Sequence, residues 1–272
     1  MPGLAKYLRE FGWEPIVLTM PLPLGTTLSY RVVEAPFQNW LASTVQAFGF
    51  KSSCSIKTQL AQKIGMENLS KSVDWLSKPV GDILTYPDEV KGWAGAATQA
   101  ASKLIEDETF DAVLSTSPPV SNHIIAARIK KRFGLPWLAD FPHLWSQNNG
   151  YCQGNFRQRF DSWREKKTLK IADALITLNA PLATKLATLH QQDVYKISHG
   201  FDPQTVNQPP APLTLSFSIT HTGSWHPVFR EPSLMLSGLS SLIEKGKLNK
   251  SDLDVRFYGD KQPWLDEQIA RF

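Results

Sequence analysis

The stretch that decides the fold is DAVLSTSPPVSNHIIAARIKKRFGLPWLADFPHLW, residues Asp111–Trp145. It opens with a short apolar run, Asp111–Ser115, which predicts a strand that ends at Ser117-Pro118-Pro119. A second apolar run, Trp137–Phe141, predicts another strand after an intervening helix. Strands joined through a helix run parallel, so the loops after both strands should open at the same carboxyl edge of one sheet. That edge is where such sheets bind ligands.

The helix between these strands is expected to have defined ends and one apolar face. Ser121 is a suitable N-cap, and Gly134 is expected to end the helix. The cations Lys130–Arg132 suit the last turn, where they complement the helix dipole. The face toward the sheet should consist of Ile124, Ile125 and Ile129.

The bulk composition is typical of a soluble globular protein. At 272 residues, with 42% hydrophobic and 20% charged residues, the chain is expected to form one domain and part of another. Two cysteines, Cys54 and Cys152, cannot form a disulfide framework, which fits a reducing compartment. The N-terminus does not have the pattern of a signal peptide, and prolines or polar residues interrupt each candidate membrane span. We therefore expect a cytoplasmic protein.

The 111–145 stretch closely resembles the N-terminal domain of GT-B glycosyltransferases of family 4, the bacterial exopolysaccharide and lipopolysaccharide type. Other patches resemble the same family in the same order along the chain. They are KYLREFGWEPIVLT (6–19), YPDEVKGW (86–93), IADALITLNAP (171–181), HGFDP (199–203), THTGSW (220–225) and VRFYGD (255–260). The resemblance implies an α/β fold of GT-B type, a retaining sugar transfer, and no requirement for a metal ion or a cofactor.

The resemblance also implies a domain plan. Residues 1–205 would form a Rossmann-like, acceptor-side domain with a parallel sheet, and 216–272 would begin a second Rossmann-like domain that binds the nucleotide sugar. A Pro-rich linker, 206–215, would join them. In the family a first strand and a Gly-rich loop precede the helix expected at 3–11, and an acidic E-x7-E motif lies in the second domain. We expect this chain to lack the first strand and the E-x7-E region.

Several enzyme classes are disfavoured because their motifs are absent from the sequence. It contains no GxGxxG fingerprint, no GxxxxGK[ST] loop, no HExxH and no GxSxG. These absences argue against a dehydrogenase, a P-loop kinase, a zinc protease and an α/β-hydrolase. We also expect no nucleic-acid partner, because no recognition helix or RNA-binding motif accompanies the basic residues.

Five residues near the predicted carboxyl edge are candidates for the acceptor side of the site. His143 and Asp140 are the catalytic candidates, since an imidazole or a carboxylate can orient an acceptor hydroxyl. The family commonly has Arg-Asp where this chain has Pro142-His143, so the role of His143 does not follow directly. The alternatives are a histidine that caps a strand end and an aspartate that caps a turn. Ser117, His123 and Trp145 are the acceptor-binding candidates, with local hydrogen bonding or core packing as their alternative roles.

The donor-side candidates follow the strand expected at 216–220. A glycine, Gly223, lets the backbone approach a phosphate, and Ser224 lies beside it. Arg230, just before the helix expected at 232–245, would neutralise the departing diphosphate. The alternative is an ordinary loop with a surface arginine.

The net charge of +4 concentrates in two short stretches, 128–132 and 157–170. Solvated helix faces explain such clusters in most proteins, and attraction to anionic lipids or to donor phosphates is the functional alternative. Residues 37–63 combine aromatic side chains with lysines, a pattern found both in helix packing and at a bilayer interface. The functional alternative is peripheral contact with the inner membrane face.

The sequence thus favours a glycosyltransferase fragment. It would transfer a sugar from a nucleotide-sugar donor to a saccharide or lipid-linked acceptor hydroxyl in surface polysaccharide or glycolipid synthesis. Two alternatives remain. Because of the expected truncation, the chain could be a catalytically inactive remnant that acts as a binding module. Because some nucleotide-sugar epimerases share the GT-B architecture, the other alternative is such an epimerase.

Overall fold

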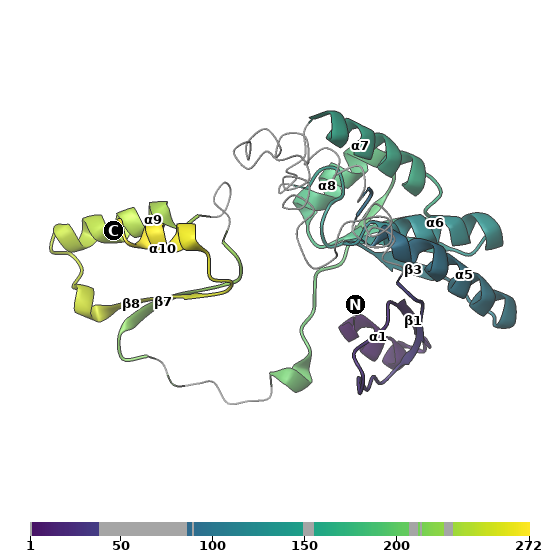
Figure 1. Cartoon of the computed structure of the whole chain (residues 1–272), viewed down its shortest axis with the longest axis horizontal. Helices are drawn as coiled ribbons and strands as arrows, with labels where there is room; N and C mark the ends of the chain where they lie inside the picture. The colour runs from purple at the N-terminus through teal and green to yellow at the C-terminus, as the bar shows by residue number, and fades with distance from the viewer. Residues whose placement is uncertain are drawn as a thin grey trace, which may run out of the picture. The chain divides into compact units, whose positions relative to one another are not determined.

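A computed structural model describes residues 2–37, 86–88, 90–148, 155–206, 212, 214–225 and 231–272 of the chain (Figure 1). Most of the aromatic and lysine pattern in 37–63 lies outside these ranges, including Trp40, Phe48 and Lys51. The chain divides into two compact units, residues 1–202 and 203–272, which we call the first and the second unit.

The first unit is built on a four-stranded parallel sheet. Its strands are β3 (Val113–Thr116), β4 (Trp137–Phe141), β5 (Ala174–Thr177) and β6 (Val194–Lys196), paired in the order β3-β4-β5-β6. This confirms the prediction of a parallel, Rossmann-like α/β arrangement. The central strand β4 has the bounds expected from the sequence.

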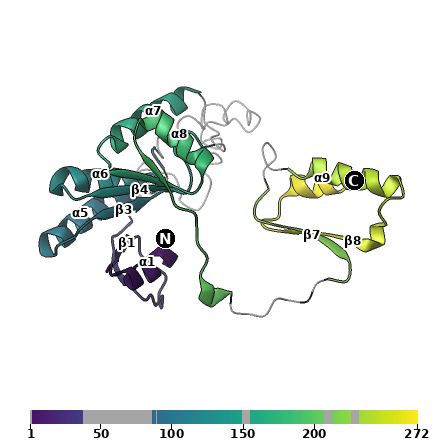
Figure 2. The same cartoon turned by 180° about the vertical axis from the view of Figure 1, so that it is seen from behind.

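Three helices pack side by side against this sheet: α6 (Ser121–Phe133), α7 (Asn155–Leu169) and α8 (Ala180–His190) (Figure 2). Each contributes to one core with the inward-facing residues of β4 and β5. The fully buried members of that core are Trp137, Ala139, Phe141, Leu169, Leu175 and Leu186. At about 25 cal/mol per Å² of apolar surface, burial of this core is the main stabilising contribution to the first unit.

The ends of α6 agree with the prediction at one terminus only. Gly134 ends the helix with φ 74, the left-handed conformation that glycine adopts without strain. Ser121 is not the N-cap: it is the first helical residue, and Val120 precedes it without a capping bond. The cap comes instead from Asp88, whose carboxylate accepts hydrogen bonds from the Ser121 amide at 2.7 Å and hydroxyl at 2.8 Å. A local sequence pattern does not reveal a cap supplied from 33 residues away.

A separate pair of parallel strands lies in the first unit before the main sheet. Helix α1 (Pro2–Leu8) leads into β1 (Ile16–Thr19), and β2 (Arg31–Glu34) pairs with β1. Helix α5 (Lys91–Asp107) covers this pair, and the Trp93 indole donates to the Ala35 carbonyl oxygen at 3.1 Å.

The second unit repeats the strand–helix–strand pattern on a smaller scale. Strands β7 (Phe217–Thr222) and β8 (Leu253–Tyr258) pair in parallel, with α9 (Ser233–Glu244) between them in sequence and α10 (Pro263–Ile269) after them. These elements match the strands and helix expected at 216–220, 232–245 and 254–258 to within two residues. No helix of the described residues is both long and apolar enough to cross a bilayer.

Candidate functional site

The loops after β3 and β4 meet at the carboxyl edge of the main sheet. Thr116 lies opposite Asp140 in the parallel register, and its hydroxyl donates to Asp140 Oδ2 at 3.0 Å. One residue further on, the Ser117 amide donates to the Asp140 carbonyl oxygen at 3.1 Å, and the Ser117 hydroxyl donates to the His143 carbonyl oxygen at 3.4 Å. The structure thus brings Ser117, Asp140 and the His143 backbone together, as expected for neighbouring parallel strands.

Asp140 has the most unusual environment among the candidate residues. Its side chain is half-buried, and this burial raises the pKa of the carboxyl above its ordinary value of 3.8. The hydrogen bond from Thr116 acts in the opposite direction and lowers this pKa. A half-buried carboxylate with a raised pKa at a ligand-binding edge is a candidate proton acceptor.

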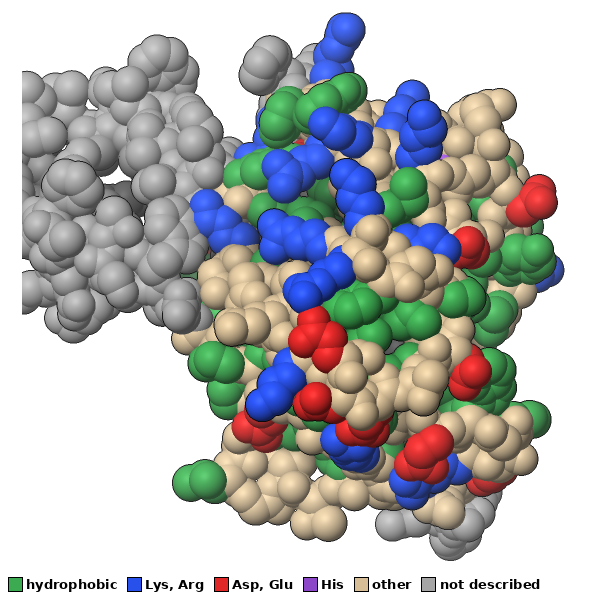
Figure 3. Space-filling view, turned by 90° about the vertical axis from the view of Figure 1, so that its right-hand side faces the viewer, with side chains coloured by type: hydrophobic (Ala, Val, Ile, Leu, Met, Phe, Trp, Pro, Cys, Tyr) green, Lys and Arg blue, Asp and Glu red, His purple; other side chains and the backbone are tan. Residues whose placement is uncertain are grey.

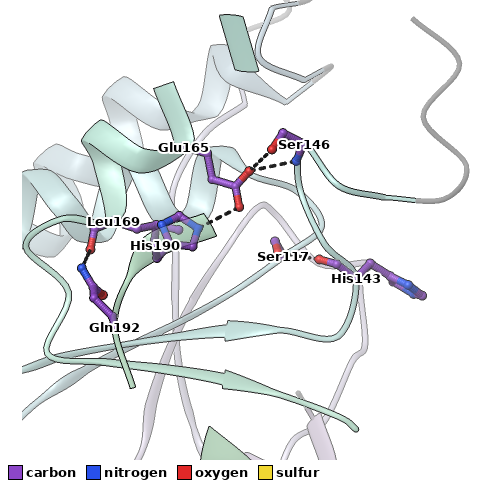
Figure 4. Close-up of polar contacts among 7 residues, drawn as sticks. All are labelled: Ser117, His143, Ser146, Glu165, Leu169, His190 and Gln192. Carbon is purple, nitrogen blue, oxygen red and sulfur yellow. Dashed lines mark hydrogen bonds and ion pairs between the residues drawn. The ribbon is translucent and has the colours of Figure 1, made fainter. Parts of the chain in front are cut away.

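The His143 side chain lies apart from this cluster. It is exposed, and in Figure 4 it points away from Ser117 and Ser146. Only its backbone carbonyl contacts Ser117. Trp145, in the same loop, is buried at 6% exposure and belongs to the main core. Of the two, only the His143 side chain is free to meet a ligand without rearrangement.

His123 is part of the core as well. The ring is completely buried, lies 4.3 Å from the Phe141 ring centroid, and forms a 2.7 Å hydrogen bond between Nδ1 and the Ser115 hydroxyl. Burial lowers the pKa of His123 to about 3, so the imidazole stays neutral at physiological pH. The interior position separates this ring from any ligand at the sheet edge.

A buried polar cluster that the sequence did not reveal fixes the loop after β4. The Glu165 carboxylate on α7 accepts from the Ser146 amide at 2.9 Å and from the Ser146 hydroxyl, and it lies 3.1 Å from His190 Nε2 on α8 (Figure 4). Both the Glu165 and His190 side chains are 1% exposed. The carboxylate stands between the hydroxyl and the imidazole, which is the wrong order for a nucleophilic triad, so the cluster holds the loop in position.

The second unit has its own pair of loops at the carboxyl edge of β7 and β8. Gly223 has φ 124, and its amide donates to the Tyr258 carbonyl oxygen at 2.8 Å. The backbones come so close that a Cβ on Gly259 would lie 2.3 Å from the Gly223 carbonyl oxygen. Beside this contact the Ser224 hydroxyl donates to Asp260 Oδ2 at 3.3 Å. Arg230 lies outside the described residues.

Asp260 and Glu165 are polar residues that sequence reasoning missed. The same rule that selected Gly223 would have found Asp260, because it follows the next parallel strand at the same edge. Glu165 carried no such signal, since its partners lie 19 and 25 residues away. Within the described ranges, no three His, Cys, Asp or Glu side chains gather closely enough to hold a metal ion.

Comparisons with known proteins give a distant likeness among solved structures. No family model matches the chain. No curated protein matches it either. Among solved structures, a chain of the glycosylation-associated protein (Gap123) complex from Streptococcus agalactiae matches with a TM-score of 0.38 and 14% sequence identity. The match covers 65% of this chain and 32% of that chain, so this protein spans about a third of its length.

The environment of Asp140 leads to a pH-dependent prediction. The folded state raises the pKa of this carboxyl, so it binds a proton more tightly than the unfolded state does. The free energy of unfolding therefore falls as the pH rises from 3.8 through the folded-state pKa and the carboxyl becomes charged. Asp140→Asn removes the charge and retains an oxygen that can accept from Thr116. The melting temperature of the variant relative to the parent chain should therefore be higher at about pH 7 than at about pH 4. Thermal unfolding at both pH values measures this, and a difference that does not change with pH would contradict it.

The buried cluster leads to a second prediction. Glu165→Ala leaves the Ser146 amide and His190 without their acceptor and should lower the free energy of unfolding by about 3 kcal/mol. Ser146→Ala removes one donor and should cost about 1 kcal/mol. The adjacent exposed Lys166→Ala is the control and should change stability by less than about 0.5 kcal/mol. Urea unfolding compares the three variants; equal losses for Glu165→Ala and Lys166→Ala would refute the role of the cluster.

Proposed function

We propose that this chain is part of a GT-B-type glycosyltransferase, with residues 1–205 on the acceptor side, a linker at 206–215 and a nucleotide-sugar-binding region at 216–272. It would transfer a sugar from a nucleotide-sugar donor to a saccharide or lipid-linked acceptor hydroxyl in surface polysaccharide or glycolipid synthesis. The observation that carries the proposal is the position of Asp140. This half-buried carboxylate stands at the carboxyl edge of a parallel sheet, where α/β proteins bind their ligands.

On the acceptor side, Asp140 would orient the attacking hydroxyl. The Thr116 hydroxyl donates to Oδ2 of Asp140, and no hydrogen bond from the described residues reaches Oδ1. Oδ1 can therefore accept a hydrogen bond from the hydroxyl of the sugar acceptor. The raised pKa brings the carboxyl closer to the pH at which it would take up a proton as the new bond forms. His143, whose exposed side chain follows in the same loop, would contact the acceptor from outside the edge.

On the donor side, the backbone around Gly223 would face the diphosphate, since glycine lets the chain approach a phosphate closely. The Ser224 hydroxyl and the Asp260 carboxylate would bind donor hydroxyls. Arg230 remains our candidate for neutralising the diphosphate as the glycosyl bond breaks. Catalysis would rest mainly on this stabilisation of the leaving group.

The two sides of the site can be tested separately. UDP-glucose and GDP-mannose are the donor probes; one should raise the melting temperature, because a ligand that binds only the folded state stabilises it. Asp260→Asn should reduce the shift, whereas the exposed control Asp252→Asn should not. Asp140→Ala should keep the donor shift and lower transfer to an acceptor by about a hundredfold or more.

Other outcomes identify the alternatives. Conversion of the nucleotide sugar without any acceptor would indicate an epimerase. No thermal shift with either donor and no transfer would contradict the proposal and favour an inactive binding module.

Peripheral membrane contact is a further part of the proposal, and α7 supports it. The two acidic residues of this helix, Asp161 and Glu165, are buried, so its exposed charges are all positive. Phe160 and Trp163 are 41% and 54% exposed and stack at 5.6 Å, with Lys167 Nζ 5.1 Å from the Trp163 ring. Figure 3 shows lysine and arginine side chains gathered with hydrophobic side chains on one face of the molecule. Exposed aromatics among cations are typical of surfaces that bind anionic lipid.

Vesicle flotation tests this contact. The chain should float with vesicles of phosphatidylglycerol and phosphatidylcholine at low salt, and much less with phosphatidylcholine alone. Exchanging two exposed lysines of α7, Lys166→Glu and Lys167→Glu, should abolish flotation. The same charge change in the second unit, Lys247→Glu and Lys250→Glu, is the matched control. Equal flotation of both double variants would exclude α7 as the contact surface.

A further inference from the structure

The segment that follows β6 runs along the carboxyl edge of the main sheet. The Ile197 amide donates to the Thr177 carbonyl oxygen at 2.8 Å. Thr177 is paired with Phe141, and its hydroxyl donates to the Phe141 carbonyl oxygen at 2.7 Å. Because Phe141 directly follows Asp140, this segment begins close to the candidate acceptor site. We call residues 197–202 the strap.

The far end of the strap is tied to helix α1. The Tyr7 hydroxyl donates to Asp202 Oδ1 at 2.6 Å, and the Lys6 ammonium donates to Asp202 Oδ2 at 2.8 Å. Two adjacent residues of α1 thus bind both oxygens of one carboxylate. In Figures 1 and 2 the segment that leaves the sheet passes beside α1. We call these two bonds the latch.

The middle of the strap lies near the Asp140 carboxylate. Burial raises the pKa of Asp140, and a protonated His199 would lower it, which requires the imidazole to be close to this carboxylate. His199 is exposed, whereas Asp140 is half-buried at the end of β4. The strap therefore borders the path from solvent to Asp140.

The latch holds the strap by bonds that can break reversibly. The Lys6 and Asp202 side chains are 29% and 26% exposed, and a partly exposed ion pair changes an equilibrium by less than about tenfold. The charge-assisted bond from Tyr7 adds to it. Along the strap, Ile197 and Phe201 are 57% and 75% exposed, so little apolar burial opposes its release.

The other end of the strap stays attached when the latch breaks. There the Ser198 hydroxyl donates to the Leu178 carbonyl oxygen at 3.3 Å, next to the bond at Ile197. Residues 199–202 can then pivot about Ser198, over at most about 14 Å of extended chain. We propose that the strap is a gate on the candidate acceptor site and that the latch between Asp202 and α1 holds this gate closed. The inference rests on the proposed function for the role of Asp140 as the group that meets a ligand.

Carboxyl footprinting of the full chain tests the gate without any sugar ligand. A water-soluble carbodiimide and an amine label carboxylates that solvent reaches, and mass spectrometry gives the rate at each residue under single-hit conditions. Asp202→Ala removes both bonds of the latch and should raise the labelling rate of Asp140 about tenfold, since this rate follows the open fraction. Tyr7→Phe removes one bond and keeps the ring, so it should raise the rate about threefold. The matched control Glu108→Ala breaks the exposed ion pair with Arg31 and should leave the Asp140 rate unchanged.

Two other carboxylates serve as references in the same measurement. The exposed Asp107 reports the activity of the reagent, and Glu165, at 1% exposure, reports any general loosening of the first unit. Both should be labelled at unchanged rates in the variants. Raising the salt concentration from about 0.05 M to about 1 M should increase the labelling of Asp140 in the unaltered chain but not in Asp202→Ala, because salt screens the latch.

Two results would overturn the proposal. One is equal labelling of Asp140 in the Asp202→Ala and Glu108→Ala chains. The other is a rise at Asp140 that Glu165 matches in both latch variants, because the latch would then support the whole unit. Failure of the proposed function gives a different result: a chain that shows gating but neither a donor shift nor sugar transfer retains the gate and loses the glycosyltransferase. Sugar transfer without gating would remove the gate alone.

Discussion

The hydroxyl of Ser115 holds together the strands that form the candidate acceptor site. It accepts a hydrogen bond from the Trp137 indole at 2.8 Å and bonds His123 Nδ1 at 2.7 Å, so it joins β3, β4 and α6 inside the core. A slip of one residue between the strands would turn Ser115 toward the other face and break both bonds. The register that places Thr116 opposite Asp140 therefore depends on this buried network. Because His123 is neutral when buried, the network needs no counter-charge.

Those parts of the fold that depend on local patterns were predictable. The apolar run at 137–141 and Gly134 specify the bounds of β4 and the end of α6, because burial and glycine conformation act over a few residues. The parallel pairing of β3 and β4 followed from the helix between them. The sequence pattern also placed Asp140 at the carboxyl edge, since it is a polar residue near the end of an apolar strand.

Interactions between distant segments were not predictable from the same patterns. The cap of α6 comes from Asp88, and the loop after β4 is fixed by Glu165, a residue that reads as one more charge on a basic helix. Histidine is a residue type often found in functional sites, but His123 lies in the core, because its ring packs on Phe141. Solvent exposure decides between these roles, and exposure depends on which helix face the sheet covers. Which helix face the sheet covers is determined by contacts across the whole fold, and local sequence patterns do not show those contacts.

The candidate acceptor site depends on the pairing of β3 with β4. In open α/β sheets ligands bind outside the carboxyl ends of the strands. The carboxyl end of β3 leads into Ser117, which contacts the Asp140 and His143 backbones. A ligand at this edge would meet the Asp140 carboxylate and the Ser117 loop together. A change of one residue in the pairing of β3 with β4 would separate these groups, so the register that buries Ser115 also builds the candidate acceptor site.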